Sequence, residues 1–304
     1  MSLVVIGTVA FDAIETPFGK TDKIVGGSAS YAGLSASYLY DKVKIVAVVG
    51  DDFHQTEIDD FNAHGINTEG LQIKKGEKSF FWAGKYHNDM NTRDTLVTDL
   101  NVLADFDPII PDSYQDCEYL MLGNLTPQVQ QTVIKRLTKR PKLIVMDTMN
   151  FWMNIALDDL LDTLKMVDVL TINDEEARQL SGEYSLVKAA AKILTMGPKY
   201  LVIKKGEHGA LLFDKDSVFA TPALPLAEVF DPTGAGDTFA GGFIGYLAKV
   251  GSINFNNMKN ALIYGSALAS FCVEKFGPER IKNLTQEEIT ERVQQFVKLS
   301  KFEL

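Results

Sequence analysis

Cysteine and histidine are scarce in this sequence, which has two cysteines and four histidines among 304 residues. Cys117 and Cys272 show no CxxC or metal-ligand spacing, and no HExxH pattern occurs. The sequence therefore argues against zinc chemistry. Buried, reduced thiols in a cytosolic protein are the state that we expect for both cysteines.

Basic residues are outnumbered, since 30 Lys and Arg against 40 Asp and Glu leave a formal net charge of −10. No basic stripe offsets the acid, which argues against binding to nucleic acid phosphates or to an anionic membrane surface. No apolar run approaches a membrane span, and residues 3–7 are too short for a signal-peptide core and lack a basic flank. We therefore expect a soluble, cytoplasmic protein.

Two common nucleotide-binding motifs are also absent. No GxxxxGK followed by Ser or Thr occurs, which excludes a P-loop nucleoside-triphosphate site. No GxGxxG follows the first expected strand, which argues against a dinucleotide-binding domain. The functional residues must then be sought among polar positions at strand ends and in glycine-rich turns.

Short apolar segments alternate with helical patterns along most of the chain. Strands are expected over residues 3–6, 44–49, 119–122, 143–146, 167–172 and 200–203, and helices over 28–40, up to 64, and 127–139. Alternation of this kind predicts a mostly parallel central sheet with helices on both faces. With no long linker or repeat, residues 1–304 are expected to form one α/β domain.

The sequence pattern changes between residues 71 and 97, where alternating and aromatic residues take the place of the helical pattern. We interpret this segment as a small antiparallel sheet that stands off the main sheet. A lid over a site, an oligomer contact and a plain edge sheet fit the pattern equally well. Trp82 is suited to stacking on a nucleoside base, and Lys85 or Arg93 to binding an acceptor phosphate. Solvated lid charges are the simpler interpretation.

The turn from Asp231 to Gly242, DPTGAGDTFAGG, leads into a long apolar helical pattern. A glycine-rich turn at a helix start offers free N–H groups and the positive end of the helix dipole to an anion. Asp237 lies inside the same turn. A carboxylate beside an anion cradle suggests phosphoryl transfer to a hydroxyl, with Asp237 as the base. The alternative is an acid that only stabilises its own helix dipole.

Two weaker patterns lie elsewhere. Asn173 and Glu176 are three residues apart at an expected helix start, where they could hold hydrated magnesium on one face. An N-cap followed by a favourable acid explains the same pair without a metal. Gly206 and Gly209 flank a tight turn that by itself is only a hairpin.

Together these motifs resemble the ribokinase, or PfkB, family of carbohydrate and nucleoside kinases. DPTGAGDTFAGG is similar to the C-terminal signature of the family, and Gly26-Gly27 to its other signature region. Residues 173–176 are similar to its NxxE element and residues 206–209 to its GxxG turn. The matches follow the family order and span nearly the whole chain. The resemblance implies a ribokinase-like three-layer fold with a lid built from segments near 10–25 and 71–97, often joined between subunits as a homodimer.

The resemblance also implies a role for each matching residue. Asp237 would take the proton from the acceptor hydroxyl, and the backbone of Gly234, Ala235 and Gly236 would bind the transferring phosphoryl group. ATP and Mg²⁺ are the implied cofactors. The nucleotide and its magnesium would be held by Asn173, Glu176, Lys204, Gly206, Gly209 and Gly265. The acceptor would be held by Asp12, Gly26, Gly27, Tyr31, Asn124 and Arg93. Asp231 and Thr233, with Gly277 nearby, match positions that bind a monovalent cation such as K⁺ in some members.

The acceptor side departs from the family pattern. Where ribokinase has GGxxxN, this chain has Tyr31 in place of the asparagine. Many sugar kinases carry DxNxR after a central strand, whereas Asp147 here is followed by Thr-Met-Asn-Phe-Trp without an arginine. Ribose as the acceptor is therefore not supported. We expect an ATP-dependent kinase acting on a small sugar, with a nucleoside kinase as the runner-up and a catalytically silent binding protein as the rival.

Overall fold

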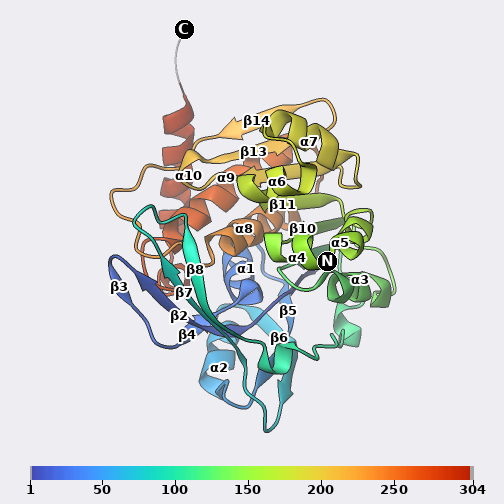
Figure 1. The fold of residues 1–304 in the computed structure, drawn as a ribbon, viewed down its shortest axis with the longest axis vertical. Helices are drawn as coiled ribbons and strands as arrows, with labels where there is room; N and C mark the ends of the chain where they lie inside the picture. The colour runs from blue at the N-terminus through green and yellow to red at the C-terminus, as the bar shows by residue number, and fades with distance from the viewer. Residues whose placement is uncertain (1, 302–304) are drawn as a thin grey trace.

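The computed structural model describes residues 2–301, which form two sheets (Figure 1). The main sheet has nine strands in the order β14-β13-β12-β11-β10-β9-β1-β5-β6. It is parallel from β6 to β12, and β13 and β14 are added antiparallel. Its strands are β1 (Leu3–Ile6), β5 (Val43–Gly50), β6 (Ile66–Lys74), β9 (Tyr119–Leu122), β10 (Leu143–Asp147), β11 (Val169–Asn173), β12 (Tyr200–Lys204), β13 (Ala210–Phe213) and β14 (Val218–Thr221).

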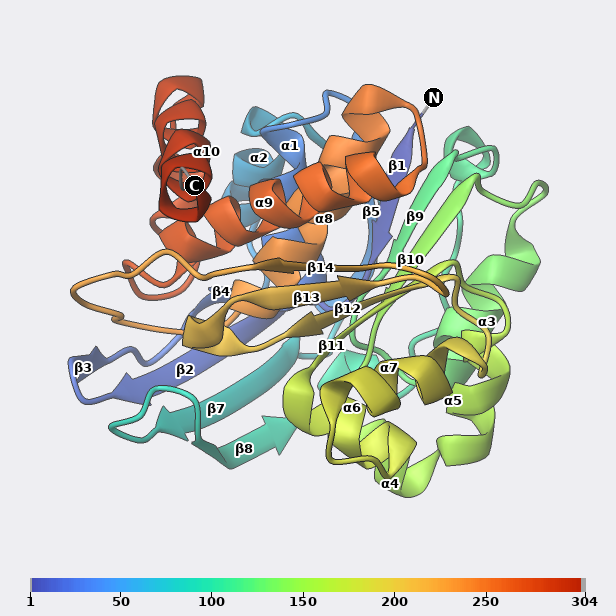
Figure 2. The same ribbon diagram turned by 90° about the horizontal axis from the view of Figure 1, so that it is seen from above.

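Helices cover both faces of this sheet, which confirms the predicted fold class (Figure 2). Successive residues of β1 point to opposite faces, so Leu3 and Val5 join one apolar core while Val4 and Ile6 join the other. The first core is covered by α1 (Ser28–Ser37), α2 (Gln55–Ala63), α8 (Ala235–Val250) and α9 (Phe255–Cys272). The second is covered by α3 (Pro127–Arg136), α4 (Asn150–Ile155), α5 (Leu157–Leu164), α6 (Asp174–Ser181) and α7 (Leu186–Leu194).

The remaining helices are short or peripheral. Helix α10 (Gln286–Ser300) packs on α9, where Val293 and Phe296 meet Ala267. Four 3₁₀ turns complete the described chain: η1 (Asn101–Leu103), η2 (Asp112–Tyr114), η3 (Gly206–His208) and η4 (Ile281–Asn283). Both cysteines are free and buried, as predicted. In residues 2–301 no helix is both long and apolar enough to cross a membrane.

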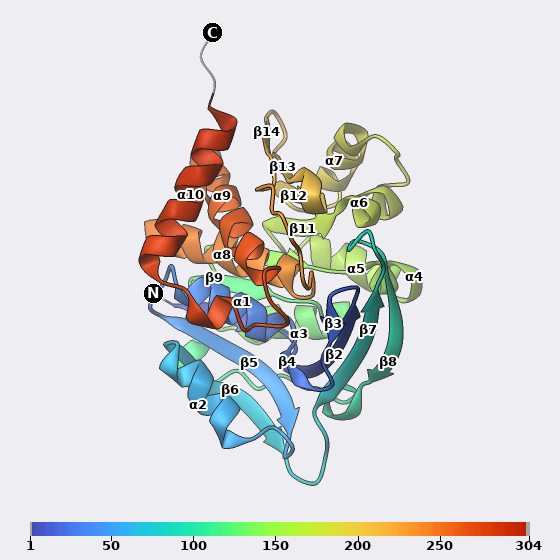
Figure 3. The ribbon, with the colours of Figure 1, turned by 90° about the vertical axis from the view of Figure 1, so that its left-hand side faces the viewer.

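The second sheet, which we call the lid sheet, is a separate layer with β8 at its outer edge (Figure 3). It contains β2 (Ala10–Thr16), β3 (Gly19–Lys20), β4 (Ile24–Gly26), β7 (Phe80–Tyr86) and β8 (Arg93–Asp99). Strands β2 and β7 pair in parallel, and the other pairs in the sheet are antiparallel. The sheet is therefore mixed, and not wholly antiparallel as expected.

Two boundaries differ from the sequence-based expectation. Residues 71–74 were expected in the insertion but extend β6 in the main sheet, where they pair in parallel with β5. Leu71 packs against one apolar core from this edge strand, whereas Ile73 on the same face is half exposed. The apolar pattern predicted no strand over residues 10–16, but these residues form β2 and Asp12 lies inside it, because the chain passes directly from the main sheet into the lid sheet.

Candidate active site

Helix α8 begins at the glycine-rich turn. Gly234 is its N-cap and has a left-handed backbone with φ of 75°, which a glycine adopts without strain. The first N–H groups of a helix have no carbonyl partner within it, although the N–H of Ala235 already donates to Pro232 O at 3.2 Å. A Cβ on Gly236 would lie 3.1 Å from the Lys204 amine. The turn at residues 234–236, which we call the cradle, is thus a helix start with the Lys204 amine beside it, and anion binding there stays a prediction.

Asp237 lies in the first turn of α8. Its pKa is raised to about 7, first because its carboxyl is enclosed by protein and second because Asp147 is nearby, while Lys204 and Arg93 act in the opposite direction. A carboxyl with a pKa near neutrality is well matched to a general base. This pKa is compatible with a base at Asp237, and the catalytic role of Asp237 stays a prediction.

Asp12 projects from β2 towards the same turn and is 4% exposed. Its pKa is raised to about 8 by burial and then by the charges of Asp231 and Asp237. A Cβ on Gly26 would lie 1.9 Å from its carboxylate oxygen, so only glycine leaves room for this side chain. A Cβ on Gly27, with φ of 92°, would lie 2.4 Å from Thr8 O. The glycine pair therefore leaves room for the Asp12 side chain and for the backbone of Thr8.

Tyr31 does not line an open pocket. Tyr31 is 1% exposed. A Cβ on Gly234 would lie 2.5 Å from its ring, so the ring packs directly against the backbone of the cradle. Its hydroxyl has no hydrogen-bond partner in the described part of the chain. Burial and then the charge of Asp12 raise its pKa well above the usual value. The structure thus places Tyr31 as packing beneath the cradle, where the sequence predicted an acceptor contact.

Asn173 and Glu176 form a capping box at the start of α6. The Asn173 side chain accepts from the Glu176 N–H at 2.7 Å, and Glu176 accepts from the Asn173 N–H at 2.8 Å. Burial raises the pKa of Glu176 to about 7, against the opposing charge of Lys204. The helix-capping alternative is therefore present in the structure. No group of three His, Cys, Asp or Glu suited to direct metal ligation occurs within residues 2–301.

Lys204 and Asp147 form an ion pair at the carboxyl ends of β12 and β10, with 2.8 Å between Nζ and Oδ2. The other oxygen of Asp147 accepts from the Thr148 N–H at 2.8 Å. Burial opposes the charge of Lys204, but Asp147 and then Glu176 raise its pKa above the usual value. In the sequence, Asp147 stood out only because the arginine of the DxNxR pattern is missing after it. In the structure its ion-pair partner is Lys204, which lies two strands away in the main sheet.

The predicted nucleotide glycines have structural roles. Gly206 and Gly209 have φ of 52° and 83° in the turn between β12 and β13. A Cβ on Gly209 would lie 2.0 Å from Thr221 O, and one on Gly206 would lie 2.8 Å from the side chain of Asn91 at the tip of the lid hairpin. Gly265 is a buried residue of α9 that faces α8, where a Cβ on it would lie 2.7 Å from Phe239 O.

The lid sheet contacts the cradle through Tyr86, which the sequence analysis missed. Its hydroxyl lies 3.2 Å from Thr233 Oγ1. Trp82, Gly84 and Tyr86 alternate along β7 and therefore share one face, and Trp82 is in register with Asp12 of β2. Arg93 pairs with Tyr86 across β7 and β8 and lies 5.9 Å from the Trp82 ring. The period-two aromatic pattern was the signal that could have identified Tyr86.

Asp231 ties the turn to the segment after α9. It is fully buried, and its two oxygens accept from the N–H groups of Thr233 and Gly277, each at 2.8 Å. Burial is the largest effect and raises the pKa of Asp231 above its usual value, and the hydrogen bonds from these two N–H groups offset part of that rise. The predicted cation residues thus lie together and cross-link two segments.

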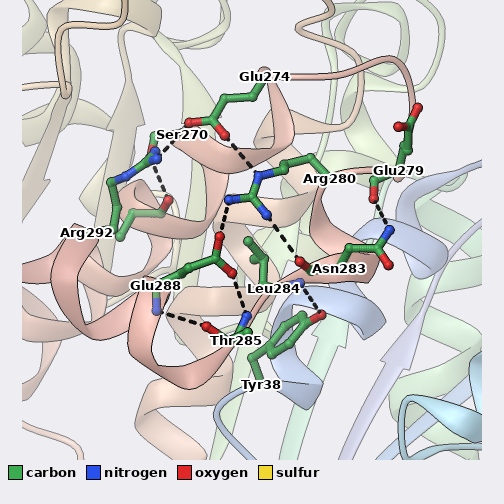
Figure 4. Close-up of polar contacts among 11 residues, drawn as sticks. Tyr38, Ser270, Glu274, Glu279, Arg280, Asn283, Leu284, Thr285, Glu288 and Arg292 are labelled. Atoms are coloured by element: carbon green, nitrogen blue, oxygen red, sulfur yellow. Dashed lines mark hydrogen bonds and ion pairs between the residues drawn. The ribbon is translucent and has the colours of Figure 1, made fainter.

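An arginine network fixes the segment that carries Gly277 (Figure 4). Arg280 donates to Glu274 at 3.1 Å and to Glu288 at 2.6 Å, and Arg292 donates to Glu274 at 2.7 Å. The Arg292 guanidinium lies 3.7 Å from the centre of the Phe271 ring. The network joins the segment after α9 to α10 and so anchors the segment whose Gly277 N–H donates to Asp231.

Asn124 follows β9 and serves a local contact. Its side-chain oxygen accepts from Trp152 Nε1 at 2.8 Å, and its amide lies 3.0 Å from Met149 Sδ. It therefore positions the segment after Asp147 at the same end of the sheet.

Comparisons with known proteins agree with this geometry. The model of the pfkB family of carbohydrate kinases matches residues 2–284. A cytidine kinase of Thermococcus kodakarensis is 33% identical over 249 residues, covering 80% of this chain and 87% of the relative.

Solved structures share the fold. A Burkholderia thailandensis nucleoside kinase in complex with inosine superimposes with a TM-score of 0.76 and 18% identity, covering 98% of this chain and 99% of the other. An Escherichia coli protein assigned as a ribokinase II, in complex with ATP and Mg²⁺, gives a TM-score of 0.77 and 20% identity, with coverage of 98% and 99%.

Proposed function

Because the chain belongs to the pfkB family of carbohydrate kinases, which are phosphotransferases acting on hydroxyl groups, we propose that it is an ATP- and Mg²⁺-dependent nucleoside kinase. The sequence alone favoured a small sugar as the acceptor. The observation that supports the nucleoside is the register of Trp82 with Asp12, since an aromatic ring then shares a face of the lid sheet with the carboxyl that we propose binds a hydroxyl. The resemblance to a cytidine kinase supports the same choice.

Asp237 removes the proton of the acceptor hydroxyl, and the cradle at residues 234–236 receives the developing negative charge. A base within hydrogen-bond reach contributes about 10²–10⁴-fold in rate. Phosphoryl transfer otherwise depends on positioning and charge stabilisation. The pKa of about 7 leaves much of Asp237 ionised at neutral pH.

ATP would supply the phosphoryl group, with Mg²⁺ shielding its charge. The residues present fit the anionic phosphate groups of ATP. Gly236 has no Cβ, so no side chain stands between its backbone and the Lys204 amine. Glu176 would hold magnesium through water, with Asn173 fixing its position through the capping box. The turn at Gly206 and Gly209 would lie against the nucleotide.

The acceptor ribose would be bound by Asp12, and the base would stack on Trp82, with Arg93 beside the ring. Asp12 is 4% exposed while Tyr86 contacts Thr233. Entry of the acceptor therefore requires the lid sheet to separate from the turn.

A small free sugar is the second candidate, favoured by the description of the family as carbohydrate kinases. ADP release against cytidine, inosine, adenosine, ribose, fructose and sugar phosphates separates the candidates. We expect the highest kcat/KM for a nucleoside. Highest turnover on a free sugar would replace the proposal by the second candidate, and ligand binding without turnover of any compound would favour a silent binding protein.

The Trp82→Ala variant tests the base contact directly. Because base stacking on an aromatic side chain is worth about 1–3 kcal/mol, KM for the nucleoside should rise about 5–150-fold while KM for ribose stays unchanged. Tyr184→Ala, which removes an exposed aromatic residue between α6 and α7, is the matched control. An equal effect of Trp82→Ala on nucleoside and sugar would exclude the base contact.

A monovalent cation such as K⁺ is proposed beside Asp231 and Thr233, which lie at one end of the cradle. Exchange of K⁺ for a bulky organic cation should then lower turnover.

A homodimer through the lid sheet is proposed from the open edge strand β8, where Leu96 and Val97 are exposed. Sedimentation of the intact chain measures its oligomeric state.

A further inference from the structure

Lys204 occupies a position that an ordinary nucleotide contact does not explain. It is the last residue of β12, yet its side chain is only 18% exposed. Its amine is 2.8 Å from Asp147 Oδ2 and 3.1 Å from the place of a Cβ on Gly236. The amine thus lies between the end of β10 and the first turn of α8, at the cradle itself.

The surroundings of this amine are acidic. Asp147, Glu176 and Asp237 all act on Lys204, and each raises its pKa. In return the charge of Lys204 holds down the pKa of Glu176 and of Asp237. The other cation that acts on Asp237 is Arg93, which comes from the exposed edge strand of the lid sheet. Lys204 is therefore the inner positive charge among three carboxyl groups.

We propose that Lys204 is a catalytic residue that contacts the phosphoryl group during its transfer, and that Asp147 positions its amine. This inference rests on the proposed kinase function. An anionic phosphoryl group at residues 234–236 must enter beside three carboxyl groups, which repel it. A cation fixed at the cradle offsets this repulsion where charge develops.

The chemistry balances without a further reactant. The acceptor oxygen loses its proton to Asp237 and forms a bond to the γ-phosphorus. The bond from that phosphorus to the β,γ-bridging oxygen breaks, and ADP leaves with the electron pair. Lys204 stays protonated throughout and contributes only its charge and N–H groups.

A purely structural ion pair is the competing explanation, and it predicts a different result. Loss of a structural pair would lower stability and weaken ATP and ADP alike. Loss of a contact to the transferring phosphoryl group would weaken nucleoside triphosphate and leave ADP nearly unchanged. The ratio of the two affinities separates these cases without any acceptor.

The experiment measures binding of ADP and of a non-hydrolysable ATP analogue, with Mg²⁺, by titration calorimetry. Lys204→Gln keeps a donor for Asp147 but removes the charge, and Lys204→Met removes both. For each variant we expect the triphosphate to bind about 10–100-fold more weakly, the range for a hydrogen bond to a charged group, with ADP affinity within about threefold. Lys204→Arg should retain most of the preference for triphosphate. Lys199→Met, one residue before the start of the same strand, should change neither affinity.

Turnover on the best acceptor should fall about 10²–10³-fold in Lys204→Gln, mainly in kcat, as for loss of one group that stabilises transition-state charge. Equal weakening of ADP and triphosphate, or no change in either, would overturn the inference. If Lys204→Met fails to fold, Lys204→Gln and Lys204→Arg still decide the question. A wild-type chain that binds neither nucleotide would instead refute the proposed function.

Discussion

Replacing Asp237 by asparagine should stabilise the folded protein at alkaline pH. The folded-state pKa of this carboxyl is about 7, against an ordinary value of 3.8, because the protein encloses it. Between these two values the folded chain holds a proton that the unfolded chain has released. The stability that this protonated form contributes is complete below pH 3.8 and is lost as the pH rises through about 7.

Asparagine resembles the protonated acid at every pH, so the variant escapes this loss. A rise of about three units in pKa corresponds to up to about 4 kcal/mol of unfolding free energy at pH 8. The difference should shrink towards zero near pH 4. Asp12 and Glu176, which also have raised pKa values, remain in both proteins. The contribution of Glu176 therefore largely cancels in the comparison, whereas the pKa of Asp12 falls in the variant because the charge of Asp237 is lost, which adds to the stabilisation of the variant.

Urea unfolding of wild-type and Asp237→Asn protein at several values between pH 4 and 8 measures this difference. Asp158→Asn is the matched control, because Asp158 also lies in the first turn of a helix but is exposed. Its replacement should cost only about 0.3–1 kcal/mol from the lost helix-dipole interaction. A variant that is no more stable than wild type at pH 8, or a difference that does not vary with pH, would refute the reasoning.

Three further substitutions test the supports of the site. Gly26→Ala places a methyl group 1.9 Å from the Asp12 carboxylate. It should cost about 1–3 kcal/mol of unfolding free energy and raise the acceptor KM, and an unchanged KM would speak against Asp12 as an acceptor ligand. Tyr86→Phe removes the hydroxyl contact to Thr233; denaturation should show a loss of about 0.5–1.5 kcal/mol, and kinetics a higher acceptor KM. Arg280→Ala removes the hydrogen bond to Glu274 and should lower the unfolding free energy in denaturant by about 1.5–3 kcal/mol. An unchanged unfolding free energy would mean that the arginine network does not stabilise the segment that carries Gly277.

The C-terminal turn was the most predictable part of the site. Its function depends on backbone conformation and helix start, which the spacing of Gly234, Gly236 and Asp237 encodes locally. The strand ends could also be predicted from the sequence, because Asn173 and Lys204 come at the ends of apolar segments that form strands of the main sheet. The fold class follows from the same alternation of strands and helices.

Contacts between distant segments could not be inferred in this way. Tyr31 was expected to touch the acceptor, but its ring supports Gly234, some two hundred positions away in the chain. The pairing of Lys204 with Asp147 and of Tyr86 with Thr233 likewise depends on how strands and sheets come together. One alternating pattern also described both residues 71–74 in the main sheet and β7 in the lid, because side chains alternate with a period of two in a strand of either sheet.

The most direct test of the central claim is the turnover of Asp237→Asn on the best acceptor of the panel, measured as ADP release across pH. If Asp237 is the base, wild-type kcat/KM should rise with pH with an apparent pKa of about 7. The variant should lose about 10²–10⁴-fold in kcat while its affinity for ADP stays nearly unchanged. Near-normal turnover in Asp237→Asn would contradict the account.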